Sequence, residues 1–242
     1  MVGIYLACIF YSLFHPMHKE LPKPLPPDQL TPKITQLVCA IEELYDSPLA
    51  NSEYWPRENI TQKEHALQSA RLAQKNNPNI HALIAAALLH SLSSLLNEQN
   101  DLFVHKFLKP IWGEEVAQPI LSSNTAQRFL AAVDSGYVFK LSETNQHLLE
   151  QQGGALSQDS PEYTAFRKSP YFERSLALRR WHDEAKTVDK DTPSLKEFHE
   201  LLIEVAIENL QDLHPSHEYK EIVTAIDQMQ KKIQTCLATQ TH

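Results

Sequence analysis

The sequence predicts an all-α protein, and three observations lead to that fold class. Only five of its 242 residues are glycine, whereas 42% are hydrophobic. Segments with the alternating polar and apolar residues of a half-buried strand are hard to find. Residues 79–96, NIHALIAAALLHSLSSLL, are apolar on nearly every side of a helix, and such a helix belongs at the centre of a bundle. We therefore expect a helical bundle built around one long central helix, with Asn79 as its N-cap.

The remaining helices follow from apolar periodicity and from capping residues. Thr61 with Glu64 forms a capping box before a second helix, and Ser194 with Glu197 forms another before a helix that ends at Leu210. Ser142 is expected to cap a helix that stops at the glycine pair 153–154. Further helices are predicted over residues 34–44, 102–109, 114–133 with a break near Ser122, 170–186 and 217–237.

The two ends of the chain are expected to lie outside the bundle proper. Residues 1–14, MVGIYLACIFYSLF, are apolar but too short to cross a bilayer, and no basic residue precedes them. They could dock on protein, anchor weakly to a membrane, or reflect the choice of start site. Residues 15–32 hold six of the fifteen prolines and predict an extended linker. The predicted organisation is an extension over 1–30, a bundle over 31–212, and a C-terminal amphipathic helix and tail over 213–242.

Charge and cysteine content exclude several classes of function. The net charge of −8 gives no basic surface for nucleic acid or for an anionic membrane. Cys8, Cys39 and Cys236 are scattered and form no CxxC pair, so neither a disulfide framework nor a zinc ribbon is indicated. A reducing cytoplasm suits this pattern.

The histidines are the candidates for chemistry, because the sequence has no nucleophile elbow, glycine-rich phosphate loop or HExxH motif. His65, His90 and His182 lie inside three different predicted helices. Helical bundles build metal sites from such inward-facing side chains, and three neutral imidazoles suffice for zinc or Fe(II). The alternative is a set of separate core histidines bonded to neighbours. The others are expected in tails, at a helix start, in a mixed segment or facing solvent: His15, His18, His242, His81, His105, His147, His199, His214 and His217.

Six sequence blocks, read in order between residues 31 and 210, resemble the HD-domain superfamily. More narrowly, they are similar to the HD-domain oxygenases of organophosphonate breakdown and to relatives described as phosphohydrolases. The blocks are ITQKEHALQSARLA, LLHSLSSLL, WGEEVAQPI, AQRFLAAVD, LSETNQHLLEQQGG and SPYFERSLALRRWHDEAK. The resemblance implies an HD bundle with a two-metal iron site and a small phosphonate or phosphate ester as substrate.

The resemblance also implies where metal and substrate would bind, and this chain departs from the family at several of those positions. The first metal's positions carry His65, His90 and His182, whereas the aspartate that bridges both metals corresponds to Ser91. The second metal's histidine positions fall on Ser94, Asn100 and Ser123, with His105 the nearby substitute. Two positions that contact the substrate in the family are changed, with Gln127 in place of a lysine and Asn145 in place of a serine. Three others match the family's pattern: Arg179, Gln152 and Glu58.

These departures decide the predicted function. Two-metal chemistry needs both ions a few ångströms apart, and the bridging carboxylate supplies the charge that allows it. We therefore predict a degenerate HD-domain protein, a pseudoenzyme with no required cofactor that keeps a weak anion-binding pocket at Arg179. The alternatives are a single-metal phosphohydrolase with one iron or zinc ion supported by Asp183, and an active iron-dependent organophosphonate oxygenase. The expected partner is a small anionic molecule or another protein.

Overall fold

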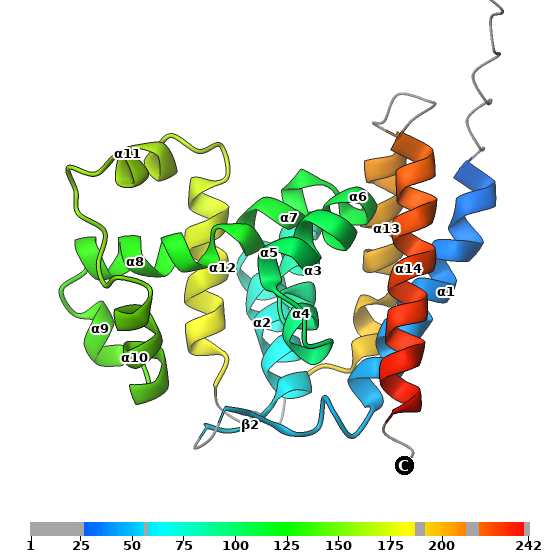
Figure 1. Ribbon diagram of the computed structural model, residues 1–242, viewed down its shortest axis with the longest axis horizontal. Helices are drawn as coiled ribbons and strands as arrows, with labels where there is room; N and C mark the ends of the chain where they lie inside the picture. The colour runs from blue at the N-terminus through cyan, green and yellow to red at the C-terminus, as the bar shows by residue number, and fades with distance from the viewer. Residues whose placement is uncertain (1–26, 56–57, 187–191, 212–217, 240–242) are drawn as a thin grey trace, which may run out of the picture.

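The computed structural model describes residues 27–55, 58–186, 192–211 and 218–239, and it confirms the all-α class (Figure 1). The one sheet among these residues is a two-stranded antiparallel hairpin of β1 (Glu53–Trp55) and β2 (Glu58–Thr61). None of the described helices is long and apolar enough to cross a membrane. The helices are α1 (Pro27–Asp46), α2 (Gln62–Asn76), α3 (His81–Leu89), α4 (Leu92–Leu95), α5 (Asn100–Phe103), α6 (Lys109–Trp112), α7 (Glu114–Leu121), α8 (Ser123–Val133), α9 (Tyr137–Lys140), α10 (Glu143–Gln151), α11 (Pro161–Arg167), α12 (Phe172–Glu184), α13 (His199–Gln211) and α14 (Glu218–Ala238).

Helices α2 and α3 form the centre of the larger of two hydrophobic cores. Every residue from Leu83 to Leu89 in α3 is buried, as the all-round apolar pattern predicts. Helix α2 packs against α3 through small side chains, with Ala66, Ala70 and Ala73 fully buried. The predicted capping box is confirmed, because the Glu64 N–H donates to Thr61 Oγ1 over 3.1 Å and the Thr61 N–H donates to Glu64 Oε2 over 2.9 Å.

The central stretch is not one helix, and in this respect the prediction is wrong. Helix α3 begins after Ile80, not after a side-chain cap from Asn79, and it ends at Leu89. A turn at His90 and Ser91 then leads into the short α4. His90 Nδ1 lies 2.8 Å from the Ala87 carbonyl, and the Tyr45 hydroxyl donates to the Leu88 carbonyl over 2.7 Å. These side-chain bonds to the last turn compete with continuation of the helix, and they leave His90 at its exit.

Helices α1, α13 and α14 lie side by side and cover one flank of this core (Figure 1). Helix α1 begins at Pro27, so the extended linker predicted up to residue 32 is wrong over its last six residues. Pro32 costs one helical hydrogen bond, but Leu30 and Ile34 are each only 1% exposed, and their burial favours the helix. The expected C-terminal amphipathic helix is α14, and it packs into the main core through Ile226 and Met229.

Helices α8 to α11 form a smaller lobe with its own core, on the far side of α12 from α1 and α14 (Figure 1). Helix α12 joins the two cores, since Leu176 packs into the smaller one and Leu178 into the larger. The predicted break at Ser122 separates α7 from α8, and Ser142 caps α10 by accepting from the Asn145 N–H. Helix α10 ends as predicted before Gly153 and Gly154, both at positive φ.

Two further regions differ from the sequence-based prediction. The helix expected over 102–109 runs from α5 through a π-helical turn (Val104–Leu108) and α6 to Trp112. It ends where Gly113 has φ 81°, a conformation that favours glycine. The loop expected before α2 instead holds the β1–β2 hairpin. This hairpin was not predicted because the strands are three and four residues long, too short to show a strand pattern.

Candidate metal centre and its cavity

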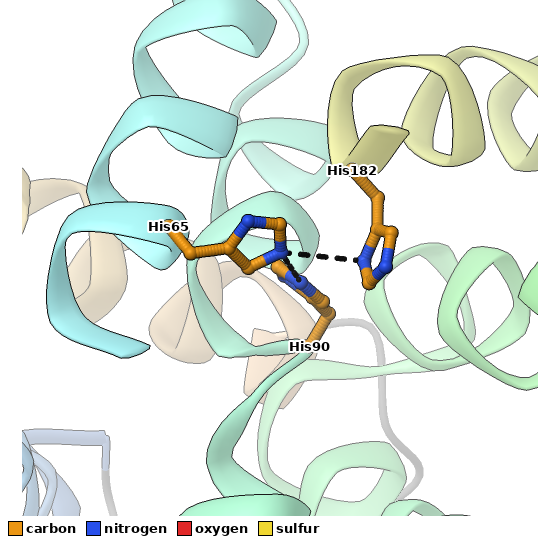
Figure 2. Close-up of side chains that lie close together, drawn as sticks. All are labelled: His65, His90 and His182. Carbon is orange, nitrogen blue, oxygen red and sulfur yellow. Dashed lines mark hydrogen bonds between the residues drawn. The ribbon is translucent and has the colours of Figure 1, made fainter. Parts of the chain in front are cut away.

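Three histidines from three helices meet where α2, the end of α3 and α12 come together (Figure 2). His65 Nε2 lies 3.1 Å from His90 Nε2 and 3.4 Å from His182 Nδ1. One ligand atom from each of the three residues lies within 4.8 Å of the others. The structure thus brings together the three residues that the sequence singled out.

Backbone carbonyls fix which ring nitrogens of two of these histidines carry the proton. His65 Nδ1 lies 2.7 Å from the Ala185 carbonyl, and His90 Nδ1 lies 2.8 Å from the Ala87 carbonyl. A carbonyl oxygen only accepts, so both Nδ1 atoms donate. Burial lowers the pKa of His90 to about 4 and holds the pKa of His65 and of His182 well below 6.5. The rings are therefore neutral near pH 7, and the Nε2 lone pairs of His65 and His90 face each other with no proton between them.

This arrangement fits one metal ion. Two lone pairs 3.1 Å apart repel each other unless a cation lies between them. Imidazole nitrogens bound to zinc at about 2.0–2.1 Å are separated by roughly 2.9 Å at right angles and roughly 3.4 Å in a tetrahedron. The separations of 3.1 and 3.4 Å lie in this range. Three neutral imidazoles also suit zinc, Fe(II) and similar borderline ions.

A cavity of about 260 Å³ adjoins the histidines between the two cores. His90 and His182 form part of its wall, with Arg179 beside them. Most of the other lining groups are hydroxyls and amides, contributed by the 91–100 region and by α8 and α10. They are Ser91, Ser93, Ser94, Asn100, Ser123, Asn124, Gln127, Asn145 and Gln152.

The guanidinium of Arg179 is held by Asp183 one turn further along α12. Arg179 Nε donates to Asp183 Oδ2 over 3.1 Å, and its terminal nitrogen donates to Oδ1 of the same carboxylate. The Tyr137 hydroxyl also donates to Asp183. Burial alone would lower the pKa of Arg179, but Asp183 raises it. The cavity's arginine thus already carries a bidentate counter-ion.

Comparisons with known proteins identify the family. The chain is 34% identical to the hydroxymethylphosphonate dioxygenase of Gimesia maris over 155 residues, which span 59% of this chain and 76% of that protein. The chain belongs to the HD-domain oxygenase family. It is also 29% identical to the [1-hydroxy-2-(trimethylamino)ethyl]phosphonate dioxygenase (glycine-betaine-forming) of Leisingera caerulea over 154 residues, 58% of this chain and 76% of that protein. An uncharacterized protein of Acanthamoeba polyphaga mimivirus shares 29% identity over 195 residues, 75% of this chain and 87% of that protein. A scan against models of protein families gives no match.

The HD-domain oxygenase resemblance assigns the lost metal positions to residues that the structure gathers in one place. Ser91, Ser94, Asn100 and Ser123 all line the cavity. Ser93 Oγ donates to Asn100 Oδ1 over 3.0 Å, which holds residues 93 and 100 together at this wall. At the positions where the resemblance implies an aspartate and histidines for a second ion, the cavity wall presents neutral hydroxyl and amide groups.

Of the other residues singled out, some join this HD-domain oxygenase cavity and some do not. Gln127, Asn145, Gln152 and Arg179 all line it. His105 does not replace a second-metal ligand, because it lines a separate hollow with Lys109 and Glu221 between the π-helical turn and α14. The backbone of Glu58 belongs to β2, while its side chain lies outside the described part of the structure.

Two expectations about side-chain partners are corrected. Asp183 was expected to support the histidines, but its described bonds are to Arg179, Tyr137 and Asn145. Arg179 and Asp183 are four residues apart on one helix face, which favours pairing with each other. His199 was expected to face solvent but is half-buried, with Nδ1 2.9 Å from Glu42 Oε1. Glu42, His199 and Cys39 form a second group of possible metal ligands between α1 and α13.

Sequence reasoning missed Tyr137, which donates to Asp183, the partner of the cavity's Arg179. Tyr137 lies in α9, in the smaller lobe, and nothing in the local pattern relates it to α12. The spacing of Arg179 and Asp183 was the one available signal for their pair. Ser93 and Asn124 also line the cavity. Ser93 stands out in the sequence as a polar group within an apolar stretch, whereas polar residues near helix ends such as Asn124 are too common to mark a site.

Proposed function

We propose that this protein is a one-metal member of the HD-domain oxygenase family that binds a small molecule but does not carry out two-metal oxygenation. The observation that carries the proposal is the histidine triad beside a cavity. At the positions that the resemblance assigns to a second metal, this cavity carries neutral side chains. His65, His90 and His182 supply three nitrogens for one ion. The described residues that line the rest of the cavity include no carboxylate.

The chain's own residues would hold the ion and the ligand in separate ways. The Ala185 and Ala87 carbonyls orient His65 and His90 so that both present an unprotonated Nε2. A single zinc or Fe(II) ion, when bound, supplies Lewis acidity and open coordination positions. Arg179 is aimed by Asp183, so it offers a fixed hydrogen-bonding edge with most of its charge balanced. Phosphonate dianions should therefore bind weakly. If they bind without being converted, the protein is a pseudoenzyme.

The experiment combines metal content, binding and turnover on the full chain. Elemental analysis should find one ion per chain, and calorimetry with hydroxymethylphosphonate should show weak binding. An oxygen electrode should record no phosphonate-dependent oxygen uptake with added iron. Arg179→Ala tests the anion contact, with the exposed Arg180→Ala as a matched neighbour. Robust oxygen uptake coupled to phosphonate loss would establish an active oxygenase and overturn the proposal.

A second candidate is a single-metal phosphohydrolase, and it is favoured by one specific feature. Three neutral imidazoles with an open side toward a cavity are the donor set of catalytic zinc sites. Hydrolysis of p-nitrophenyl phosphate would then require the triad. Activity that disappears in His90→Ala but persists in His147→Ala, an exposed histidine bonded to Gln151, would favour this candidate over a protein that only binds.

A further inference from the structure

Two amide groups of the cavity have buried atoms without a hydrogen-bond partner among the described residues. Gln127 is only 1% exposed, and its Nε2 has no partner. Gln152 is half-buried on the opposite helix, and its Oε1 also has none. Both side chains line the cavity, the first from α8 and the second from the end of α10. A buried polar atom without a partner is costly, so the pair indicates a ligand that bonds to both.

The two unpaired atoms require opposite hydrogen-bonding roles of that ligand. An amide nitrogen only donates and an amide oxygen only accepts, so the ligand must accept at Gln127 and donate at Gln152. The charged end of a phosphonate dianion has acceptors alone, so hydroxymethylphosphonate can donate only through its single hydroxyl group, whereas a polyol has several. A hydroxyl group both donates and accepts, so it could bond to either amide even if the oxygen and nitrogen of that amide exchanged places. Serine and asparagine side chains around the same wall have the same dual capacity.

The charge of the cavity wall also favours a ligand that binds through hydroxyl groups. The cation on the cavity wall is Arg179, and Asp183 pairs with it through two bonds. An ion on the histidines would add positive charge at that end of the cavity alone. The wall of serines and amides would still have no free cation among its described lining residues to meet a second negative charge. Burying an uncompensated anion against that wall is costly.

We propose that the wall formed by Gln127, Gln152 and the surrounding serines recognises a small uncharged polyhydroxylated molecule in preference to a phosphonate. The inference rests on the proposed function for its cavity, but not on the ion, because neither glutamine belongs to the triad. The cavity volume of about 260 Å³ is large enough for several waters and therefore for a short polyol.

The test is a titration of the full chain followed by protein NMR, with erythritol and hydroxymethylphosphonate as probes. It is run on the protein with one zinc per chain and again after chelation. Erythritol should bind more tightly than hydroxymethylphosphonate in the chelated protein. Gln127→Leu and Gln152→Leu should each weaken erythritol binding about fivefold, the effect of one lost hydrogen bond. Gln151→Leu, an exposed neighbour on α10, is the matched control and should leave erythritol binding unchanged.

A gain-of-charge variant gives a second, independent measurement. Gln127→Lys places a cation on the wall, so hydroxymethylphosphonate should bind at least tenfold more tightly and erythritol less tightly. The inference is overturned if erythritol does not bind, if the phosphonate binds more tightly to the unaltered chelated protein, or if both leucine variants behave like Gln151→Leu. Absence of metal from the protein would overturn the proposed function alone, because the chelated titration does not depend on it.

Discussion

Asp183→Asn should destabilise the protein more than any conservative change on the surface. The side chain of Asp183 is 12% exposed and that of Arg179 is 5% exposed, so the pair is largely removed from water. Removing one partner leaves a buried guanidinium with a neutral amide. Breaking such a buried pair costs about 3–5 kcal/mol, which is a large part of a typical stability of about 5–15 kcal/mol. The Tyr137 hydroxyl also loses its charged acceptor.

Equilibrium urea unfolding measures this loss, and two variants separate the charge from the packing. The double variant Arg179→Met with Asp183→Leu removes both charges and should cost much less than Asp183→Asn alone. Asp227→Asn breaks the exposed pair with Lys33 and should cost at most about 1 kcal/mol. If Asp183→Asn unfolds within 1 kcal/mol of the unaltered protein, Arg179 does not depend on Asp183, and its charge would be free for an anionic ligand.

Three further outcomes are expected. Purified protein should hold one zinc or iron ion per chain by elemental analysis and His90→Ala should hold none, whereas two ions per chain would mean that a second ligand set exists. In chelated protein the free energy of unfolding should fall as pH drops from about 6.5 to about 4, because unfolded His90 takes up a proton near 6.5 and folded His90 only near 4; His90→Gln should make this dependence less steep in urea titrations, while His65 and His182 maintain the remainder because burial lowers their pKa as well, and an unchanged slope would contradict the prediction for His90. Tyr45→Phe should lower stability by about 1 kcal/mol in thermal unfolding because the Leu88 carbonyl loses a buried donor, and an unchanged melting temperature would show that this bond does not stabilise the turn after α3.

Where local rules dominate, the sequence predicted the structure well. The capping boxes at Thr61 and Ser194 formed as expected, since their bonds span only three residues. The three interior histidines stood out because polar groups on apolar helix faces need partners. Which partners they would find depends on the packing of α2, α3 and α12, and no spacing along the chain encodes that packing.

The failures arose where distant contacts override local preference. The turn after Leu89 depends on Tyr45, 43 residues from the carbonyl that it binds. The start of α1 at Pro27 depends on burial of Leu30 and Ile34 in the main core, against the usual effect of proline.

The substitutions around the cavity reinforce one another. If the resemblance places a bridging aspartate at Ser91 and a lysine at Gln127, this chain has lost one negative and one positive group from the same wall. If only the carboxylate were lost, the lysine would lie beside a site with one ion. If only the lysine were lost, a two-ion site would have no lysine beside it to bind the substrate. Losing both keeps the wall neutral, as the pairing of Arg179 with Asp183 also does. A wall kept neutral by these two substitutions and by the Arg179–Asp183 pair suits a ligand bound through hydroxyl groups, while the triad offers three neutral nitrogens to a single ion.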